Sequence, residues 1–152
     1  MKSNSARRFI VCGIAWAALD LGAAGARADT APCSLLTTAQ VAAAVGANVG
    51  AGQPITAAGC SWSAPHMIVT LSLSDGGGWE QMKAPLPGVS KTPVSGLGDD
   101  AIFSTLGQPA KQYVTLSVKK GNTAYLFKVY GPSVIEQMSM EKALAGKVLA
   151  NL

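Results

Sequence analysis

The chain has 152 residues, of which 49% are hydrophobic and 13% are charged, and its formal net charge is +4. This length fits one small domain, and the charged fraction is about half of the roughly 25% usual in globular proteins. Beyond the N-terminus, no apolar run reaches the length of about 20 residues that crosses a bilayer. The composition therefore argues against a disordered chain and against a multi-pass membrane protein.

The N-terminus has the three parts of a secretory signal peptide. Basic residues, an apolar run and a stretch of small residues follow one another: Lys2, Arg7 and Arg8, then 9–19, then 22–28. We expect cleavage after Ala28, with Ala26 as the alternative site, so that 1–28 is a signal peptide and 29–152 is a single disulfide-stabilised α+β domain. A retained membrane anchor is disfavoured because Asp20 interrupts the apolar run.

Loss of this leader changes the charge of the protein. The leader holds four of the 12 basic residues and one of the eight acidic residues, so the net charge falls from +4 to +1. All three arginines leave with it, and the remaining lysines cannot make the bidentate contacts that recognise phosphate or guanine. We therefore expect a periplasmic or secreted protein with no nucleic-acid partner and no membrane anchor.

Two of the three cysteines, Cys33 and Cys60, stay in the exported chain, because Cys12 lies in the leader. A disulfide is the default state of such a pair in an oxidising compartment. We predict a Cys33–Cys60 bond, which in the chain-entropy model stabilises the fold by roughly 3 to 4 kcal/mol. A metal or redox pair is the alternative, but the sequence has neither a Cys-x-x-Cys spacing nor a second ligand nearby.

The first predicted elements are a helix and two strands. A capping box at 37–40 opens a helix over 38–45, and Gly46 ends it. Strands over 59–63 and 67–75 follow. The second of them alternates apolar with polar residues, which is typical of a strand with one buried face.

A short helix over 79–83 and a loop up to Gly98 lead to three further strands. The first of these strands covers 99–106. The other two, 113–119 and 123–130, form a hairpin around a Gly-Asn turn, whose residues tolerate positive φ.

The hairpin turn fixes which side chains share a face of the sheet. One face carries three apolar pairs, which are Val118 with Tyr125, Leu116 with Phe127, and Val114 with Val129. The reverse face carries Thr115 opposite Lys128 and Tyr113 opposite Tyr130. This reverse surface is therefore mostly polar and partly aromatic.

The last predicted element is a helix that opens with a capping box at 133–136 and runs to about Asn151. Glu141 falls inside its apolar face. A rim position, with the carboxylate reaching solvent or a lysine, is favoured over a buried functional acid. Together the elements predict an α+β fold, with an antiparallel sheet of about five strands and the N- and C-terminal helices packed on one face.

Few residues suit catalysis. His66 is the only histidine, and it lies beside Pro65 at a predicted turn. No nucleophile-elbow pattern supplies a serine for it, so a solvated turn residue is favoured over a catalytic base. Zinc sites combine several His and Cys ligands, and only one imidazole remains once the disulfide forms. We expect no metal and no cofactor.

The most distinctive short motif is Gly96-Leu97-Gly98-Asp99-Asp100-Ala101. It could offer amides to an anion or carboxylates to calcium, but a tight turn with local backbone bonds is favoured, because the motif lacks the spacing of a phosphate or calcium loop. Trp79 has two interpretations, as a core side chain or as the border of a groove. The candidate binding surface is Trp79, Glu80, Gly96, Gly98, Asp99 and Asp100.

Three segments carry a family resemblance: Pro32-Cys33-Ser34-Leu35-Leu36-Thr37, Cys60-Ser61-Trp62 and the 96–101 motif. With them the chain resembles small exported bacterial proteins of uncharacterised function, and it is similar to the domain of unknown function in actinobacterial cell-envelope lipoproteins. The resemblance implies a two-cysteine α+β envelope domain with a Mog1/PsbP-like architecture. It brings no catalytic residues. The chain departs from those lipoproteins because it lacks a lipidated cysteine.

These observations support three hypotheses about function. The first is a non-catalytic exported domain that binds an envelope protein or a small ligand. The second is a small envelope hydrolase or metal-assisted enzyme that uses Asp99, Asp100, Glu80 or His66, which requires these side chains to converge. The third is an inhibitor of an envelope hydrolase or toxin, in which the disulfide scaffold presents the loop between Asp75 and Gly98.

Overall fold

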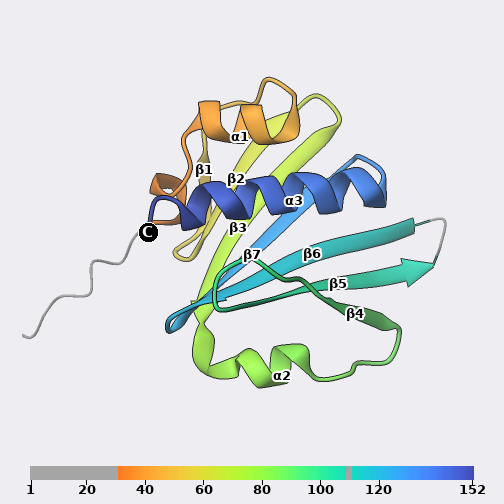
Figure 1. Cartoon of the computed structure of the whole chain (residues 1–152). Helices are drawn as coiled ribbons and strands as arrows, with labels where there is room; N and C mark the ends of the chain where they lie inside the picture. The colour runs from red at the N-terminus through yellow and green to blue at the C-terminus, as the bar shows by residue number, and fades with distance from the viewer. Residues whose placement is uncertain (1–30, 109–110) are drawn as a thin grey trace, which may run out of the picture.

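The computed structural model describes residues 31–108 and 111–152 (Figure 1). The signal peptide predicted over 1–28 lies outside the described residues. The elements are, in chain order, η1 (Pro32–Ser34), α1 (Thr38–Val45), β1 (Gln53–Thr56), β2 (Gly59–Ala64), β3 (Met67–Asp75), η2 (Gly76–Gly78), α2 (Trp79–Lys83), β4 (Val89–Pro93), β5 (Asp100–Gln108), β6 (Lys111–Lys120), β7 (Thr123–Tyr130) and α3 (Val134–Leu149).

The strands form one antiparallel sheet of seven strands in the order β1-β2-β3-β7-β6-β5-β4. The α+β class is confirmed, but the expectation of about five strands is wrong. The two strands that the sequence did not reveal are β1 and β4, which lie at the two edges of the sheet. All four residues of β1 are exposed, and β4 ends at Pro93 in a stretch predicted to be a loop. Edge strands bury little and tolerate proline, so they lack the alternation that reveals a half-buried strand.

Helices α1 and α3 lie together on one face of the sheet (Figure 1). Both predicted capping boxes are present, one with Thr37 and Gln40 and one with Ser133 and Glu136. The core between the helices and the sheet contains Val41, Trp62, Phe103, Leu116, Phe127, Leu144 and Val148. The predicted disulfide is confirmed, since Cys33 and Cys60 are bonded with their Cα atoms 5.1 Å apart. It ties η1 to the second strand of the sheet.

Helix α2 lies against the opposite face of the sheet. Ala101 and Phe103 belong to the core under α1 and α3, so Ile102 between them points to the other side. There Ile102 and Ala124 form a second, smaller cluster with Trp79 of α2. The short helix therefore covers one part of this face.

Strands β6 and β7 pair only near their shared turn. Their ladder runs from Lys120 and Thr123 to Leu116 and Phe127 and ends there. Figure 1 shows the two strands diverging beyond this point, with α3 lying over the opening. The predicted pairings of Val114 with Val129, Thr115 with Lys128 and Tyr113 with Tyr130 are therefore wrong, although the two apolar pairs nearer the turn are confirmed. Across 31–108 and 111–152, no helix is both long and apolar enough to span a bilayer.

Candidate functional site

Asp99 has a structural role at the hairpin turn. Its Oδ2 accepts a hydrogen bond of 2.6 Å from the backbone N–H of Gly121, and Lys120 Nζ lies 3.1 Å from its Oδ1. The amide of Gly121, followed by the ammonium of Lys120, lowers the pKa of the Asp99 carboxyl. Gly98 has φ +61 and its backbone lies close to the carbonyl of Lys119, so a side chain there would clash. The 96–101 motif therefore holds the β6–β7 turn in place.

Asp100 holds α2 on the sheet. Its Oδ2 accepts a hydrogen bond of 2.8 Å from the indole N–H of Trp79 and one of 3.0 Å from Lys83 Nζ. These two donors, the indole first, lower the pKa of Asp100. Lys83 also pairs with Glu80 at 3.2 Å, and both acids raise the pKa of the Lys83 ammonium. Each polar group of this cluster thus has a partner inside the protein.

The structure brings the predicted binding surface together at one end of the sheet, but not as a groove bordered by an exposed aromatic ring. Trp79 is only 2% exposed and packs against Ile102 and Ala124, which agrees with its interpretation as a core side chain and not with the border of a groove. The indole is buried because α2 needs an apolar anchor to stay on the sheet. Gly96 has φ +80 and no neighbour near its Cα hydrogens, which is typical of an exposed turn.

His66 lies far from the two aspartates. It is exposed in the β2–β3 turn with φ +65, next to the first residue of β3. Asp100 pairs through Lys119 and Ala124 with Ser74 near the other end of β3. That separation along the strand is about 25 Å. His66 is therefore remote from Asp99, Asp100 and Glu80, and no group of three or more His, Cys, Asp or Glu suited to a metal ion occurs in the described part of the chain.

Glu141 is buried, which corrects the expected rim position. Its side chain is 0% exposed within the core under α3. Oε1 accepts a hydrogen bond of 3.0 Å from the backbone N–H of Val129, while Oε2 has no partner among the described residues. Burial raises the pKa of Glu141 to about 7, against the smaller opposing effects of the Val129 and Leu116 amides and the Lys128 charge. The group is therefore close to half protonated at neutral pH.

Glu141 and Gln137 accept hydrogen bonds from backbone amides that β6 and β7 leave unpaired where they diverge. The two side chains lie one turn apart on α3, and Gln137 Oε1 accepts a hydrogen bond of 3.3 Å from the backbone N–H of Val114. Gln137 also donates a hydrogen bond of 2.8 Å to the carbonyl of Pro132. Side chains of the helix thus satisfy the amides that a continued ladder would have paired. Gln137 and Glu141 thus have a structural role, and the ends of β6 and β7 farthest from their shared turn stay apart.

An exposed row of apolar and aromatic side chains crosses the sheet on the face opposite α1 and α3. We call it the tyrosine row, and it consists of Ile68, Tyr130, Tyr113 and Leu106. Ile68 pairs with Tyr130 and Leu106 pairs with Tyr113, while the two tyrosine rings meet edge to face at 6.3 Å. Ile68, Tyr113 and Leu106 are 47%, 52% and 52% exposed. Three of the seven exposed large hydrophobic side chains of the described residues therefore lie on one row.

The next row toward α2 is hydrophilic. It consists of Thr70 paired with Lys128 and Thr115 paired with Ser104, and all four side chains are half-buried. Ser104 accepts a hydrogen bond of 3.0 Å from Lys91. Among the described residues, the hydroxyls of Thr70 and Thr115 and the ammonium of Lys128 make no hydrogen bond or ion pair. We call these four residues and the tyrosine row together the open face.

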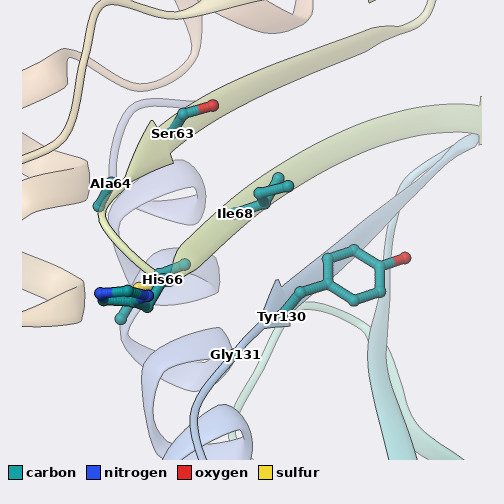
Figure 2. Close-up of a pocket in the computed structure, with 7 residues that line it drawn as sticks. Ser63, Ala64, His66, Ile68, Tyr130 and Gly131 are labelled. Carbon is teal, nitrogen blue, oxygen red and sulfur yellow. The ribbon is translucent and has the colours of Figure 1, made fainter.

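A shallow depression of about 430 Å³ adjoins one end of the open face. Figure 2 shows Ser63, Ile68 and Tyr130 pointing to the same side of the sheet, while the ring of His66 at the turn points to the other side. Gly131 continues the wall beside the turn. The depression therefore lies at the ends of β2, β3 and β7, where the open face meets the β2–β3 turn.

The open face was partly visible in the sequence. The alternation of the hairpin placed Tyr113, Tyr130, Thr115 and Lys128 on one face, and the two tyrosine rings do meet there, although the backbones of β6 and β7 are no longer paired at these residues. Ile68 and Leu106 were missed as members, because their place beside the tyrosines depends on the strand order. No protein-family model, curated protein or solved structure matches the chain.

Proposed function

We propose that this protein is an exported, non-catalytic binding domain, periplasmic or secreted, whose open face is its ligand-binding surface. The observation that carries this proposal is the exposed tyrosine row. Tyrosine supplies a large, rigid and amphipathic contact surface, and clustered exposed apolar side chains mark interaction sites more often than isolated ones do. The disulfide supports an oxidising compartment.

The arrangement of charged groups favours binding over catalysis. The carboxylates of Asp99 and Asp100 are held by backbone, indole and ammonium donors, and these donors lower both pKa values. A general acid or base near neutral pH needs the opposite shift. Glu141 does have a raised pKa, but it is 0% exposed and cannot touch a substrate. Its place under α3 fits a structural acid.

Site-specific photocrosslinking in the cells that produce the protein tests this proposal. A benzophenone amino acid replaces Ile68 or Leu106 on the open face, or Ile135 on α3 as the matched control. Ile135 is 81% exposed, so it is at least as accessible to random encounters. We expect adducts from the two open-face positions and not from the control. Equal labelling at all three positions, or none at any of them, would contradict the assignment.

A further inference from the structure

We infer that the open face binds an acidic polysaccharide, a linear chain of sugars that carry carboxylates. This inference rests on the proposed function, because it names the ligand class of the same surface. It requires three properties of the surface to agree, namely a row of apolar side chains, hydroxyls without a partner in the protein and a net positive charge.

The tyrosine row matches the apolar side of a sugar ring. Sugar rings carry C–H groups on their faces and hydroxyls around their edges, so they pack against aromatic rings while their polar groups stay solvated. Tyr113 and Tyr130 each add a phenolic hydroxyl that can donate and accept at the edge of such a contact. The row crosses β3, β7, β6 and β5, so it can follow a linear polymer across the strands.

The second row supplies hydroxyls without partners in the protein. Thr70 and Thr115 each offer one donor and two acceptor positions, and both are half-buried, so that part of each side chain reaches solvent. A hydroxyl that both donates and accepts suits a polyol, whose own hydroxyls do the same. Ser63, exposed in the adjoining depression, extends this set beyond β3.

Charge selects an acidic ligand. Lys128 lies in the middle of the open face without an ion pair among the described residues. Five of the six described acids are held by other partners: Asp75, Glu80, Asp99, Asp100 and Glu136. The sixth, Glu141, feels the charge of Lys128 but is buried under α3 and forms no ion pair with it. A carboxylate of the ligand would therefore meet a cation that has no salt-bridge partner. The same arrangement disfavours a second copy of this chain, which would bring Lys128 toward its counterpart.

Other occupants fit less well. The two rows hold eight side chains in total, far fewer than the roughly 20 to 30 residues that each partner contributes to a standard protein interface. A peptide could instead add a strand at a sheet edge. Both edge strands contain proline, Pro54 in β1 and Pro93 in β4, which removes ladder donors. A polymer lying on the face needs neither a large area nor a free edge.

Calorimetric titration of the purified protein with an oligogalacturonate and a hyaluronan oligosaccharide tests this inference. We expect saturable binding that weakens with added salt. Tyr113→Ala should lower the affinity about fivefold, and Lys128→Met, which keeps the apolar stem, about tenfold. Lys147→Met is the matched control, because Lys147 is also half-exposed but lies on α3, and it should leave the affinity unchanged. Circular dichroism checks that each variant is folded.

Four results would each overturn the inference. They are the absence of saturable binding by both acidic probes, equal affinity for a neutral cello-oligosaccharide of the same length, equal affinity for poly-L-glutamate, and an unchanged affinity of Lys128→Met. The photocrosslinking experiment distinguishes a wrong ligand class from a wrong binding surface. Open-face adducts without binding of the acidic probes would remove only the ligand class, whereas loss of both would remove the binding surface itself.

Discussion

Replacing the buried Glu141 with glutamine should stabilise the protein above neutral pH and have little effect at acid pH. In Glu141→Gln the amide oxygen can still accept the hydrogen bond from the Val129 N–H. The amide NH₂ takes the place of the unpartnered Oε2, which carries the proton in the neutral acid. The variant therefore copies the protonated form of Glu141 and cannot ionise.

The magnitude follows from the raised pKa. Burial moves the pKa of Glu141 from 4.5 to about 7 in the folded state, and this difference corresponds to about 3 kcal/mol of free energy of unfolding. For a carboxyl with a raised pKa, the stabilising contribution is complete below 4.5 and is lost as the pH rises to about 7. The wild-type protein should thus lose about 3 kcal/mol over this window relative to the variant, and the difference should be constant above it.

Urea unfolding followed by tryptophan fluorescence at steps from pH 4.5 to 8.5 measures this difference. Glu136→Gln is the control with the opposite sign, because hydrogen bonds from Ser133 lower the pKa of Glu136. That variant should be less stable than wild type by a nearly constant amount across this range, because the contribution of Glu136 is lost only below its ordinary pKa of 4.5. A stability gain of Glu141→Gln that does not change with pH would refute the buried, protonatable state of this side chain.

Three further predictions concern residues that stabilise the sheet and the elements around the open face. Breaking the disulfide with Cys60→Ala should lower the free energy of unfolding by about 3 to 4 kcal/mol, and unfolding of the oxidised wild type with and without reductant provides the check. Gly98→Ala should lower the free energy of unfolding by about 2 to 4 kcal/mol, because φ is +61 and the new Cβ meets the Lys119 carbonyl. Gly121→Ala, at φ +58 with open space around it, should lower it by only about 1 kcal/mol. Equal losses would argue against the close backbone contact. Asp100→Ala should leave the buried indole N–H of Trp79 without its acceptor, lower stability by about 1 to 3 kcal/mol and change the fluorescence of that ring, while an unchanged melting curve would contradict the role of Asp100 in holding α2.

Local sequence patterns determined much of this protein. Capping boxes at Thr37 and Ser133 set the starts of α1 and α3, because the cap satisfies amides within one turn of chain. Alternation revealed β3, and the Gly-Asn turn revealed the β6–β7 hairpin with its first two apolar pairs. The Cys33–Cys60 bond followed from counting the cysteines that remain once the expected signal peptide is removed. Each of these signals is complete within a short segment or within the composition itself.

Tertiary structure alone decided the rest. Strands β1 and β4 exist because the sheet offers them edges to pair with, and their own residues bury too little to show it. The acid Glu141 is buried because two diverging strands need an acceptor for the Val129 amide, a demand that arises only once α3 lies over them. The open face likewise depends on strand order, since Ile68 and Leu106 join the two tyrosines only when β3 and β5 flank the hairpin. Sequence fixes what a residue can do within its own segment, whereas packing between distant segments determines which surface is left for a ligand.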